Sequence, residues 1–316
     1  MASTTKLLTI AIPTYNRGDF LHHSLSSALE ACANFSDEVE VIVSDNCSTD
    51  NTQYIVNSFT LKYPYLFYYR NEKNLGMNAN FYQLTDKYAT GKYCWLLGDD
   101  DIIDKNMFPF IFNILKNNDI DFLKLSFDIR RIEDINDPLP EYIDNAKYYI
   151  NGSFGEITNI NVCSSNILNT FISASIFRLE PFKKHTKPSN YLVNNWNSFE
   201  EVFSHACIHA IIFNKSTNAI FLSYPTLSVC QHEKDWDDKM TSICTVYLPK
   251  LYYFYLKQGV HKKDLSNTKK IIVKDCMLFL LKGKKSKKTF WTLWFLMQNI
   301  TTAIKVVFSI LILKFK

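Results

Sequence analysis

The sequence predicts an α/β fold in which a mostly parallel sheet is flanked by helices. Three observations carry this prediction. Short apolar runs alternate with segments of helical periodicity, the connections between them are short, and polar residues follow the apolar runs. With 316 residues and 47% hydrophobic content, the chain is long enough to bury a sizeable core.

The expected strands are apolar runs, and they lie at residues 7–12, 39–43, 65–69, 93–97, 122–127, 173–179 and 219–229. Apolar residues at helical spacing or helix-starting polar residues predict helices near 21–32, 50–60, 76–88, 105–117 and 199–213. Two more helices are expected within 241–281, where Pro249 should kink or split the first.

The composition divides the chain into parts. Residues 128–160 are rich in Asp, Asn, Pro and Tyr, which is typical of a domain boundary or a loop. We therefore predict an α/β part at 1–127, a second part of the same domain at 128–240, and a helical region at 241–316.

The net charge of the chain is +4, and the excess of basic residues lies near the C-terminal end. Residues 282–316 contain eight lysines and no acidic residue, so the rest of the chain carries 4 − 8 = −4, which argues against nucleic acid as a partner. The eight cysteines form no C-x-x-C pair, and neither a zinc site nor a disulfide framework is expected. The residues before the first strand lack the apolar core of a signal peptide, and we expect a cytoplasmic location.

The most informative stretch follows the predicted strand at 93–97. Gly98 allows a sharp turn, and Asp99, Asp100 and Asp101 then lie at the carboxyl end of the strand, where open α/β sheets bind ligands. Adjacent carboxylates repel one another unless a cation or hydrogen-bond donors offset their charge, and their hard oxygens suit Mg²⁺ or Mn²⁺. The alternative is a solvated acidic turn that caps the next helix. No G-x-G-x-x-G or Walker motif follows the first strand.

Four motifs occur in order at the ends of predicted strands or at the start of a helix. They are Pro-Thr-Tyr-Asn-Arg at 13–17, Ser-Asp-Asn-Cys-Ser-Thr-Asp at 44–50, Asn-Leu-Gly-x-x-x-Asn at 74–80 and Gly-Asp-Asp-Asp at 98–101. This series resembles the family-2 nucleotide-sugar glycosyltransferases, which have the GT-A fold. The resemblance covers residues 6 to about 125 most strongly. The wording Trp-Leu-Leu-Gly-Asp-Asp-Asp is most similar to abequosyltransferase-like enzymes of bacterial surface polysaccharide synthesis.

The resemblance implies donor-binding roles for Pro13, Thr14, Tyr15, Arg17, Asp45 and Asn80. The first three match the segment that lines the nucleoside pocket, and Asp45 matches the carboxylate that reads the base. The alternative for the first segment is a turn that packs Tyr15 into the core. Ser48, Thr49 and Asp50 are expected to cap the following helix.

The resemblance also implies a divalent metal, Mn²⁺ or Mg²⁺, at the family's D-x-D motif. We expect Asp101 to be a direct ligand. Asp99 and Asp101 form one D-x-D, whereas alignment by the last two acids selects Asp100 and Asp101. Of Asp99 and Asp100, the one that does not bind the metal would contact sugar or ribose hydroxyls. His232 is a candidate to complete the metal site or to contact the diphosphate.

In related enzymes the catalytic base lies C-terminal to the metal motif, and Glu201 and Glu200 are the candidates here, with Glu201 slightly favoured. The alternative is that both are first-turn acids of a helix capped by Ser198. Trp236 is a candidate to stack on an acceptor sugar. His205 and His209, four residues apart, are expected to be core histidines.

The C-terminal segment 282–316 joins lysines to a Trp-rich sequence, which is typical of an interfacial helix on an anionic membrane. The alternative is a helical hairpin packed on the catalytic domain or on a second subunit. The predicted activity is metal-dependent inverting transfer of one sugar from a nucleotide-sugar to a glycan acceptor, in capsule, O-antigen or lipooligosaccharide synthesis. We expect this acceptor to be lipid-linked. A sugar-nucleotide nucleotidyltransferase and a non-catalytic membrane-associated scaffold are the alternatives.

Overall fold

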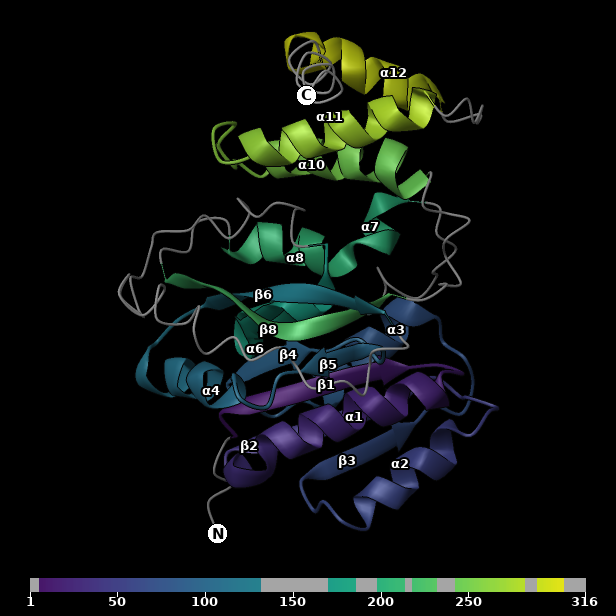
Figure 1. Cartoon of the computed structure of the whole chain (residues 1–316), viewed down its shortest axis with the longest axis vertical. Helices are drawn as coiled ribbons and strands as arrows, with labels where there is room; N and C mark the ends of the chain where they lie inside the picture. Colours follow the sequence, from purple (N-terminus) through teal and green to yellow (C-terminus); the bar gives the residue numbers. More distant parts are fainter. Residues whose placement is uncertain are drawn as a thin grey trace. The chain divides into compact units, whose positions relative to one another are not determined.

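The structure is a computed structural model that describes residues 6–131, 170–185, 198–213, 218–231, 242–281 and 289–303. The chain divides into two compact units. The first comprises Met1–Ile160, Phe171–Asn194 and Lys215–His232, and it contains the sheet (Figure 1). The second comprises Asn161–Thr170, Asn195–Asn214 and Glu233–Lys316, and its described residues are almost all helical.

Four parallel strands begin the sheet in the order β3-β2-β1-β4. They are β1 (Leu8–Thr14), β2 (Val39–Asp45), β3 (Leu66–Arg70) and β4 (Tyr93–Leu96). The connecting helices are α1 (Gly18–Cys32), α2 (Thr52–Thr60) and α3 (Met77–Tyr82), the last of which continues as a π-helix, Gln83–Tyr88. The predicted alternation of strand and helix is therefore confirmed, and β1, β2 and β4 are buried along nearly their whole length.

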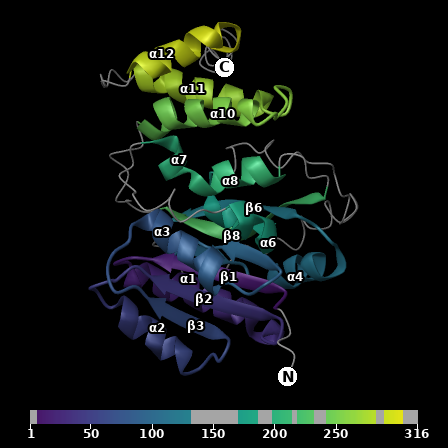
Figure 2. The same cartoon turned by 180° about the vertical axis from the view of Figure 1, so that it is seen from behind.

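The helices cover both faces of the sheet. Right-handed crossovers from β1 to β2 and from β2 to β3 place α1 and α2 on one face, and the return from β3 to β4 places α3 on the other. Seen from behind, α3 lies in front of the strands (Figure 2). The apolar residues of α1 that recur at helical spacing all lie in the core: Leu21, Leu25, Ala28, Leu29 and Cys32.

Four further strands extend the sheet in the order β4-β7-β6-β8-β5. They are β5 (Asp101–Ile103), β6 (Phe122–Arg131), β7 (Ser175–Arg178) and β8 (Ala219–Gln231), with helices α4 (Phe108–Asn117) and α6 (Leu179–His185). Among the described strands, four pairings are parallel and three, β4–β7, β6–β7 and β5–β8, are antiparallel. The sheet is thus mixed, and it includes the short strand β5 that the sequence did not predict.

The second unit contains α7 (Phe199–Val202), α8 (Ser204–Phe213), α10 (Leu248–Lys257), α11 (Ser266–Leu281) and α12 (Thr289–Gln298). A π-helix, Ile243–Tyr247, runs directly into α10, so Pro249 lies inside a continuous helical run, and the Thr245 carbonyl four residues before it accepts from the Thr292 hydroxyl at 3.1 Å. The Tyr255 hydroxyl donates to the Ala206 carbonyl at 3.1 Å, and Phe295 is fully buried. Within the described part of the chain, every helix is too short or too polar to cross a bilayer.

Candidate functional site

The polar ends of three parallel strands meet at one edge of the first unit. Thr14 is aligned with Asp45 in the β1–β2 register, and the Leu97 amide donates to the Ala11 carbonyl beside them. The turn after β4 therefore brings the acidic cluster, Asp99 to Asp101, to the ends of β1 and β2. This is the edge at which parallel α/β sheets bind ligands.

Asp99 and Asp100 are held from the end of β1. The Thr14 hydroxyl donates to Asp99 Oδ2 at 2.8 Å. Arg17 places its Nη2 2.8 Å from Asp100 Oδ2 and its Nη1 3.4 Å from Asp99 Oδ1, and its guanidinium lies 5.0 Å from the ring centroid of Phe20. All three aspartates are buried. The positive charge of the guanidinium offsets the repulsion between these adjacent carboxylates.

Gly98 and Asp101 lie at the two ends of the turn. A Cβ on Gly98 would lie 2.6 Å from Asp101 Oδ2 and 3.0 Å from Asp100 Oδ1, so the glycine is needed for the close approach of these carboxylates. The Ser173 hydroxyl accepts from the Gly98 amide at 2.8 Å and donates to Asp101 Oδ2 at 2.5 Å.

The donor set suits a hard divalent cation, because it consists of carboxylate oxygens around a glycine turn. No three His, Cys, Asp or Glu side chains among the described residues converge as a ready metal site. Proteins hold a cation of the Mg²⁺ type through one or two carboxylates together with substrate phosphates, and the acidic cluster offers buried carboxylates of this kind. His232 lies outside the described residues.

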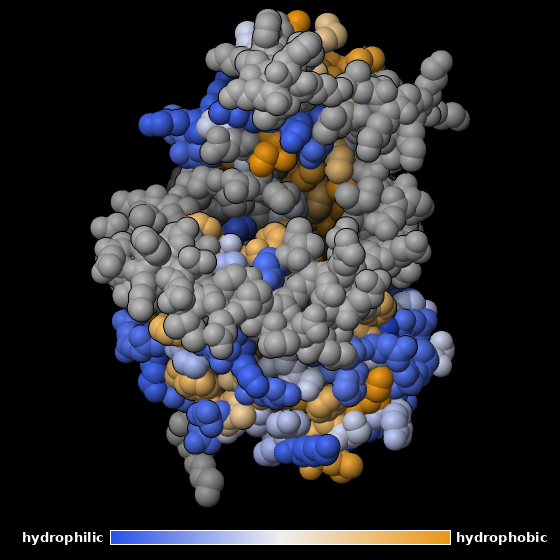
Figure 3. Space-filling view, viewed as in Figure 1, coloured by the Kyte–Doolittle hydropathy of each residue, from blue (hydrophilic) through white to orange (hydrophobic). Residues whose placement is uncertain are grey.

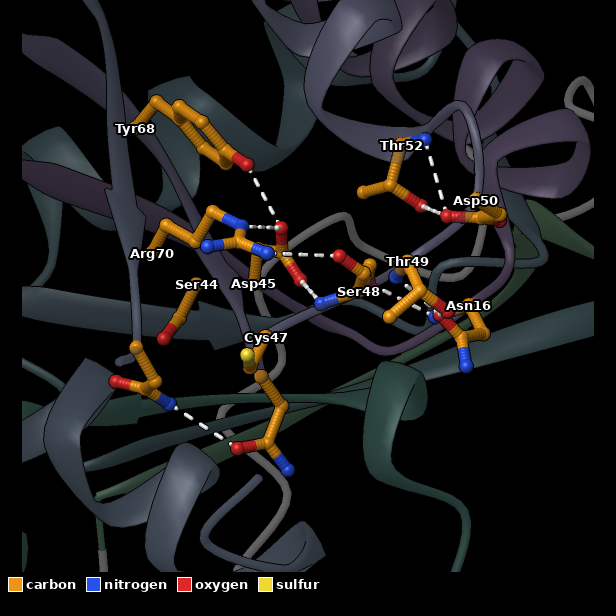
Figure 4. Close-up of polar contacts among 12 residues, drawn as sticks. Asn16, Ser44, Asp45, Cys47, Ser48, Thr49, Asp50, Thr52, Tyr68 and Arg70 are labelled. Carbon is orange, nitrogen blue, oxygen red and sulfur yellow. Dashed lines mark hydrogen bonds and ion pairs between the residues drawn. The ribbon is translucent and has the colours of Figure 1, made fainter. Parts of the chain in front are cut away.

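Asp45 ends β2 and is fully buried. Its carboxylate accepts hydrogen bonds from the Ser48 amide and the Tyr68 hydroxyl, each at 2.7 Å, and Arg70 Nε lies 3.4 Å away (Figure 4). Arg70 also donates to the Ser48 carbonyl at 2.9 Å. Burial, followed by the contact with Asp45, raises the pKa of Tyr68 well above its ordinary value. The carboxylate is therefore ordered by protein donors on both of its oxygens.

Two loops with strained backbones lie beside this carboxylate. Asn16 and Cys47 have φ angles of 52° and 68°, in the left-handed region that non-glycine residues rarely adopt. The Asn16 amide donates to Ser48 Oγ at 2.9 Å, and the Thr49 amide donates to Asn16 Oδ1 at 2.7 Å (Figure 4). These cross-loop bonds hold the strained conformations in place.

Asp50 has the structural role that the sequence predicts. Its carboxylate accepts from the amide and hydroxyl of Thr52 at the start of α2 and from the Gly18 amide at the start of α1. Burial raises the pKa of Asp50, but these hydrogen bonds outweigh it and leave the pKa below its ordinary value.

The remaining donor-side candidates differ in exposure. Tyr15 is 41% exposed and so does not pack into the core, and Pro13 before it is partly buried. Asn80 is buried, its Oδ1 accepting from Ser44 Oγ at 2.6 Å and from Asn71 Nδ2 at 3.0 Å. Its amide nitrogen donates to the Ser44 carbonyl, so Asn80 ties α3 to the end of β2.

Glu200 and Glu201 belong to the second unit, in the first turn of α7. Ser198 Oγ accepts from the Glu201 amide at 3.2 Å, which confirms Ser198 as the cap. Glu200 is exposed and Glu201 half-buried. His205 and His209 are buried on α8 with their rings 6.1 Å apart, as core histidines are. Trp236 lies outside the described residues.

Sequence reasoning missed three residues of the site: Tyr68, Arg70 and Ser173. Tyr68 and Arg70 are two positions apart on β3, and in the parallel register Arg70 is aligned with Asp45. A basic residue at the end of a neighbouring strand was the available signal. For Ser173 the sequence carried none.

Comparisons with known proteins identify a family for this chain. The family Glycosyl transferase family 2 matches residues 9–186. Abequosyltransferase RfbV of Salmonella typhimurium is 24% identical over 265 residues, which are 82% of this chain and 77% of that protein.

Among solved structures, S. aureus TarS 1–349 in complex with UDP-GlcNAc has a TM-score of 0.60 at 16% identity, covering 94% of this chain and 81% of that one. A mannosyltransferase from Pyrobaculum calidifontis in complex with GDP-Man and Mn²⁺ has a TM-score of 0.51 at 13% identity, covering 97% and 88%. These two likenesses concern the fold.

Proposed function

Because the chain belongs to glycosyl transferase family 2, we propose that the ends of β1, β2 and β4 hold a nucleotide-sugar and that one sugar passes from it to a glycan acceptor. The observation that carries this proposal is the convergence of Thr14, Asp45 and the acidic cluster at one sheet edge. No step of the proposal requires a glycine-rich phosphate loop.

The donor would lie against the segment 13–17. Tyr15 is exposed there and offers a ring to a flat base, with Pro13 and Thr14 beside it and Arg17 toward the phosphates. Asp45 would contribute to recognition of the nucleotide base, either through its carboxylate or by ordering the surrounding loop. Support comes from TarS, which was solved with UDP-GlcNAc, and from the P. calidifontis enzyme, which was solved with GDP-Man.

A divalent cation, Mn²⁺ or Mg²⁺, would offset the charge that develops on the departing diphosphate, an effect worth several kcal/mol. Asp101 and Asp99 are the ligands we propose, with Asp100 toward the sugar and His232 as a further ligand. The chain's own cation, Arg17, already contacts two of the three carboxylates and would favour the same anionic leaving group. The use of a divalent cation is supported by the P. calidifontis enzyme, which was solved with Mn²⁺.

Transfer with inversion needs a base that takes the proton of the acceptor hydroxyl, at about 3 Å from it. We propose Glu201, or Glu200, for this role. Both lie in the first turn of α7.

The acceptor we propose is lipid-linked and is met at the inner face of the cell membrane. Helix α12 exposes Leu293, Met297 and, just beyond its end, Ile300, which share one face by their spacing. In the space-filling view, hydrophobic residues lie on the surface over α12 (Figure 3). The preceding segment 282–288 contains five lysines, each worth roughly 1 kcal/mol near an anionic surface.

The activity test is release of a nucleoside diphosphate from a panel of sugar donors with Mn²⁺ present. We expect release from one donor class, its loss in chelator, and its loss in Asp101→Ala. Asp119→Ala is the matched control, because Asp119 is an exposed surface carboxylate that pairs with Lys92. Turnover that survives chelator would remove the proposed metal role. Release of pyrophosphate from a nucleoside triphosphate would indicate a nucleotidyltransferase instead.

Membrane docking is tested by sedimentation with phosphatidylglycerol vesicles. The whole chain should sediment at low salt, and a chain lacking 282–316 should stay in the supernatant. Equal sedimentation of both would refute the docking role of this segment.

A further inference from the structure

The turn that carries the acidic cluster is closed by a residue far along the chain. Ser173 lies 72 positions after Asp101, in the 3₁₀ turn Ile172–Ala174 that leads into β7. Its hydroxyl accepts from the Gly98 amide and donates to Asp101 Oδ2. One side chain thus ties together the first and last residues of the turn.

The hydroxyl of Ser173 has little freedom. The residue is fully buried, and its carbonyl accepts from the indole N–H of Trp95 at 2.7 Å. A serine hydroxyl carries one proton. Because the Gly98 amide donates to Oγ, that proton is directed at the Asp101 carboxylate.

The neighbouring acids are held by a different chemistry. Arg17 contacts Asp99 and Asp100 with a full positive charge. The Ser173 hydroxyl instead orients Asp101 through a hydrogen bond to Oδ2. A cation ligand needs both an orientation fixed in advance and its negative charge.

We infer that Ser173 is a positioning residue for a divalent cation, because it orients the Asp101 carboxylate that would bind the cation. This inference rests on the proposed function, since it assumes that the acidic cluster binds a metal at all. Both D-x-D registers that the sequence allows include Asp101, so Ser173 would act on a cation ligand in either. Ser173 acts through Asp101 and does not itself contact the cation.

The purely structural interpretation is that Ser173 only stabilises the turn. Helix α1 provides a direct comparison, because the Ser24 hydroxyl donates to the Gly98 carbonyl at 2.9 Å without contacting a carboxylate. If turn stability were all that mattered, losing either hydroxyl would have the same effect on the cation. If orientation of Asp101 matters, only the loss of the Ser173 hydroxyl would weaken cation binding.

The test is titration of the full chain with Mn²⁺, alone and with UDP or GDP present, in which electron paramagnetic resonance measures the free ion. Because partners that orient metal ligands are typically worth 10–100-fold in affinity, we expect Ser173→Ala to weaken Mn²⁺ binding by roughly 10-fold or more. Ser173→Thr keeps the hydroxyl and should retain most of the affinity. Ser24→Ala and Ser175→Ala should bind Mn²⁺ as the wild type does. Ser175 is equally buried, and its hydroxyl has no hydrogen-bond partner within the described part of the chain.

The outcomes separate the two proposals. No Mn²⁺ binding by the wild-type chain, even with UDP or GDP present, would overturn the metal in the proposed function, and the role of Ser173 with it. Mn²⁺ binding by the wild type that is unchanged in Ser173→Ala, or weakened equally in Ser24→Ala, would overturn the role of Ser173 alone. If Ser173→Ala does not fold, Ser173→Cys replaces it, because a thiol fills the space but donates only weakly and should lose affinity as well.

Discussion

Replacing Tyr68 by Phe removes a single oxygen from the site and changes little else. That hydroxyl donates to Asp45 Oδ2 at 2.7 Å, and water cannot take its place because Asp45 is fully buried. A hydrogen bond to a charged group is worth about 1.5–3 kcal/mol. Arg70 Nε remains 3.4 Å from the same oxygen, which places the expected loss in the lower half of that range. We expect Tyr68→Phe to lower the free energy of unfolding of the first unit by about 2 kcal/mol.

The measurement is differential scanning calorimetry, followed by urea unfolding. A loss of about 2 kcal/mol should lower the Tm by roughly 4–8 °C for a unit of this size. Tyr69→Phe is the matched control, because it removes the same atom from the adjacent residue, whose ring stacks on Tyr88 at 3.8 Å. We expect the control to change the stability by less than about 0.5 kcal/mol.

The reasoning fails if the two variants have the same Tm. That result would mean that the Asp45 carboxylate gains nothing from the Tyr68 hydroxyl, because water or Arg70 satisfies it equally well. The description of Asp45 as a carboxylate ordered by protein donors would then be wrong.

Three other changes probe other parts of the first unit. Gly98→Ala should lower sugar transfer by roughly 100-fold with little change in Tm, because its Cβ would displace the Asp101 carboxylate. In Gly91→Ala the Cβ would meet the backbone of Thr9 and Tyr93 at 2.6 and 2.7 Å, and this variant should instead lose about 1–3 kcal/mol of stability. Activity assays and calorimetry on both variants check these two expectations. Arg17→Met should lower the Tm of the metal-free chain, since two carboxylates lose their contact with the guanidinium. The Tm of this variant should also rise more steeply with added Mn²⁺ than the Tm of the wild type does. An equal response to Mn²⁺ would contradict the idea that Arg17 and Mn²⁺ share one carboxylate cluster. Hydrogen bonds from Arg178 and Lys92 lower the pKa of Asp119 to about 2. The stability that this carboxylate contributes is therefore present above about pH 4 and is lost as the pH falls toward 2. Urea unfolding across that window should show a shallower decline of the free energy of unfolding in Asp119→Asn than in the wild type.

Much of the first unit could be predicted because its pattern is local. Apolar runs identify β1, β2 and β4, and the periodic residues of α1 all lie in the core. The acidic cluster could be placed at the strand ends because parallel strands share one edge. The order of the strands beyond β4 could not be predicted, since periodicity does not reveal that β7 returns antiparallel beside β4 or that Asp101 begins a strand paired with β8.

The partners of the site residues could be predicted less well than the residues themselves. Asp45 is marked by its place at a strand end, but the Tyr68 and Arg70 contacts depend on the register between β2 and β3. Ser173 is separated from Asp101 by 72 positions and by no recognisable motif. Such contacts come from tertiary packing, which a single sequence does not encode in any local pattern.

The closure of the acidic turn by distant residues also affects when the site can form during synthesis. The strands β1 to β4 are complete once residue 96 has left the ribosome, but Asp101 pairs with Val229 of β8. At 5–20 residues per second, the ribosome needs roughly 7–27 s more for the 229 − 96 = 133 residues up to that partner. For this time the nascent chain carries its aspartates on an unfinished sheet edge. We therefore expect a chain stalled before β8 to be a target for chaperones and to lack a functional site, although all three aspartates are already present.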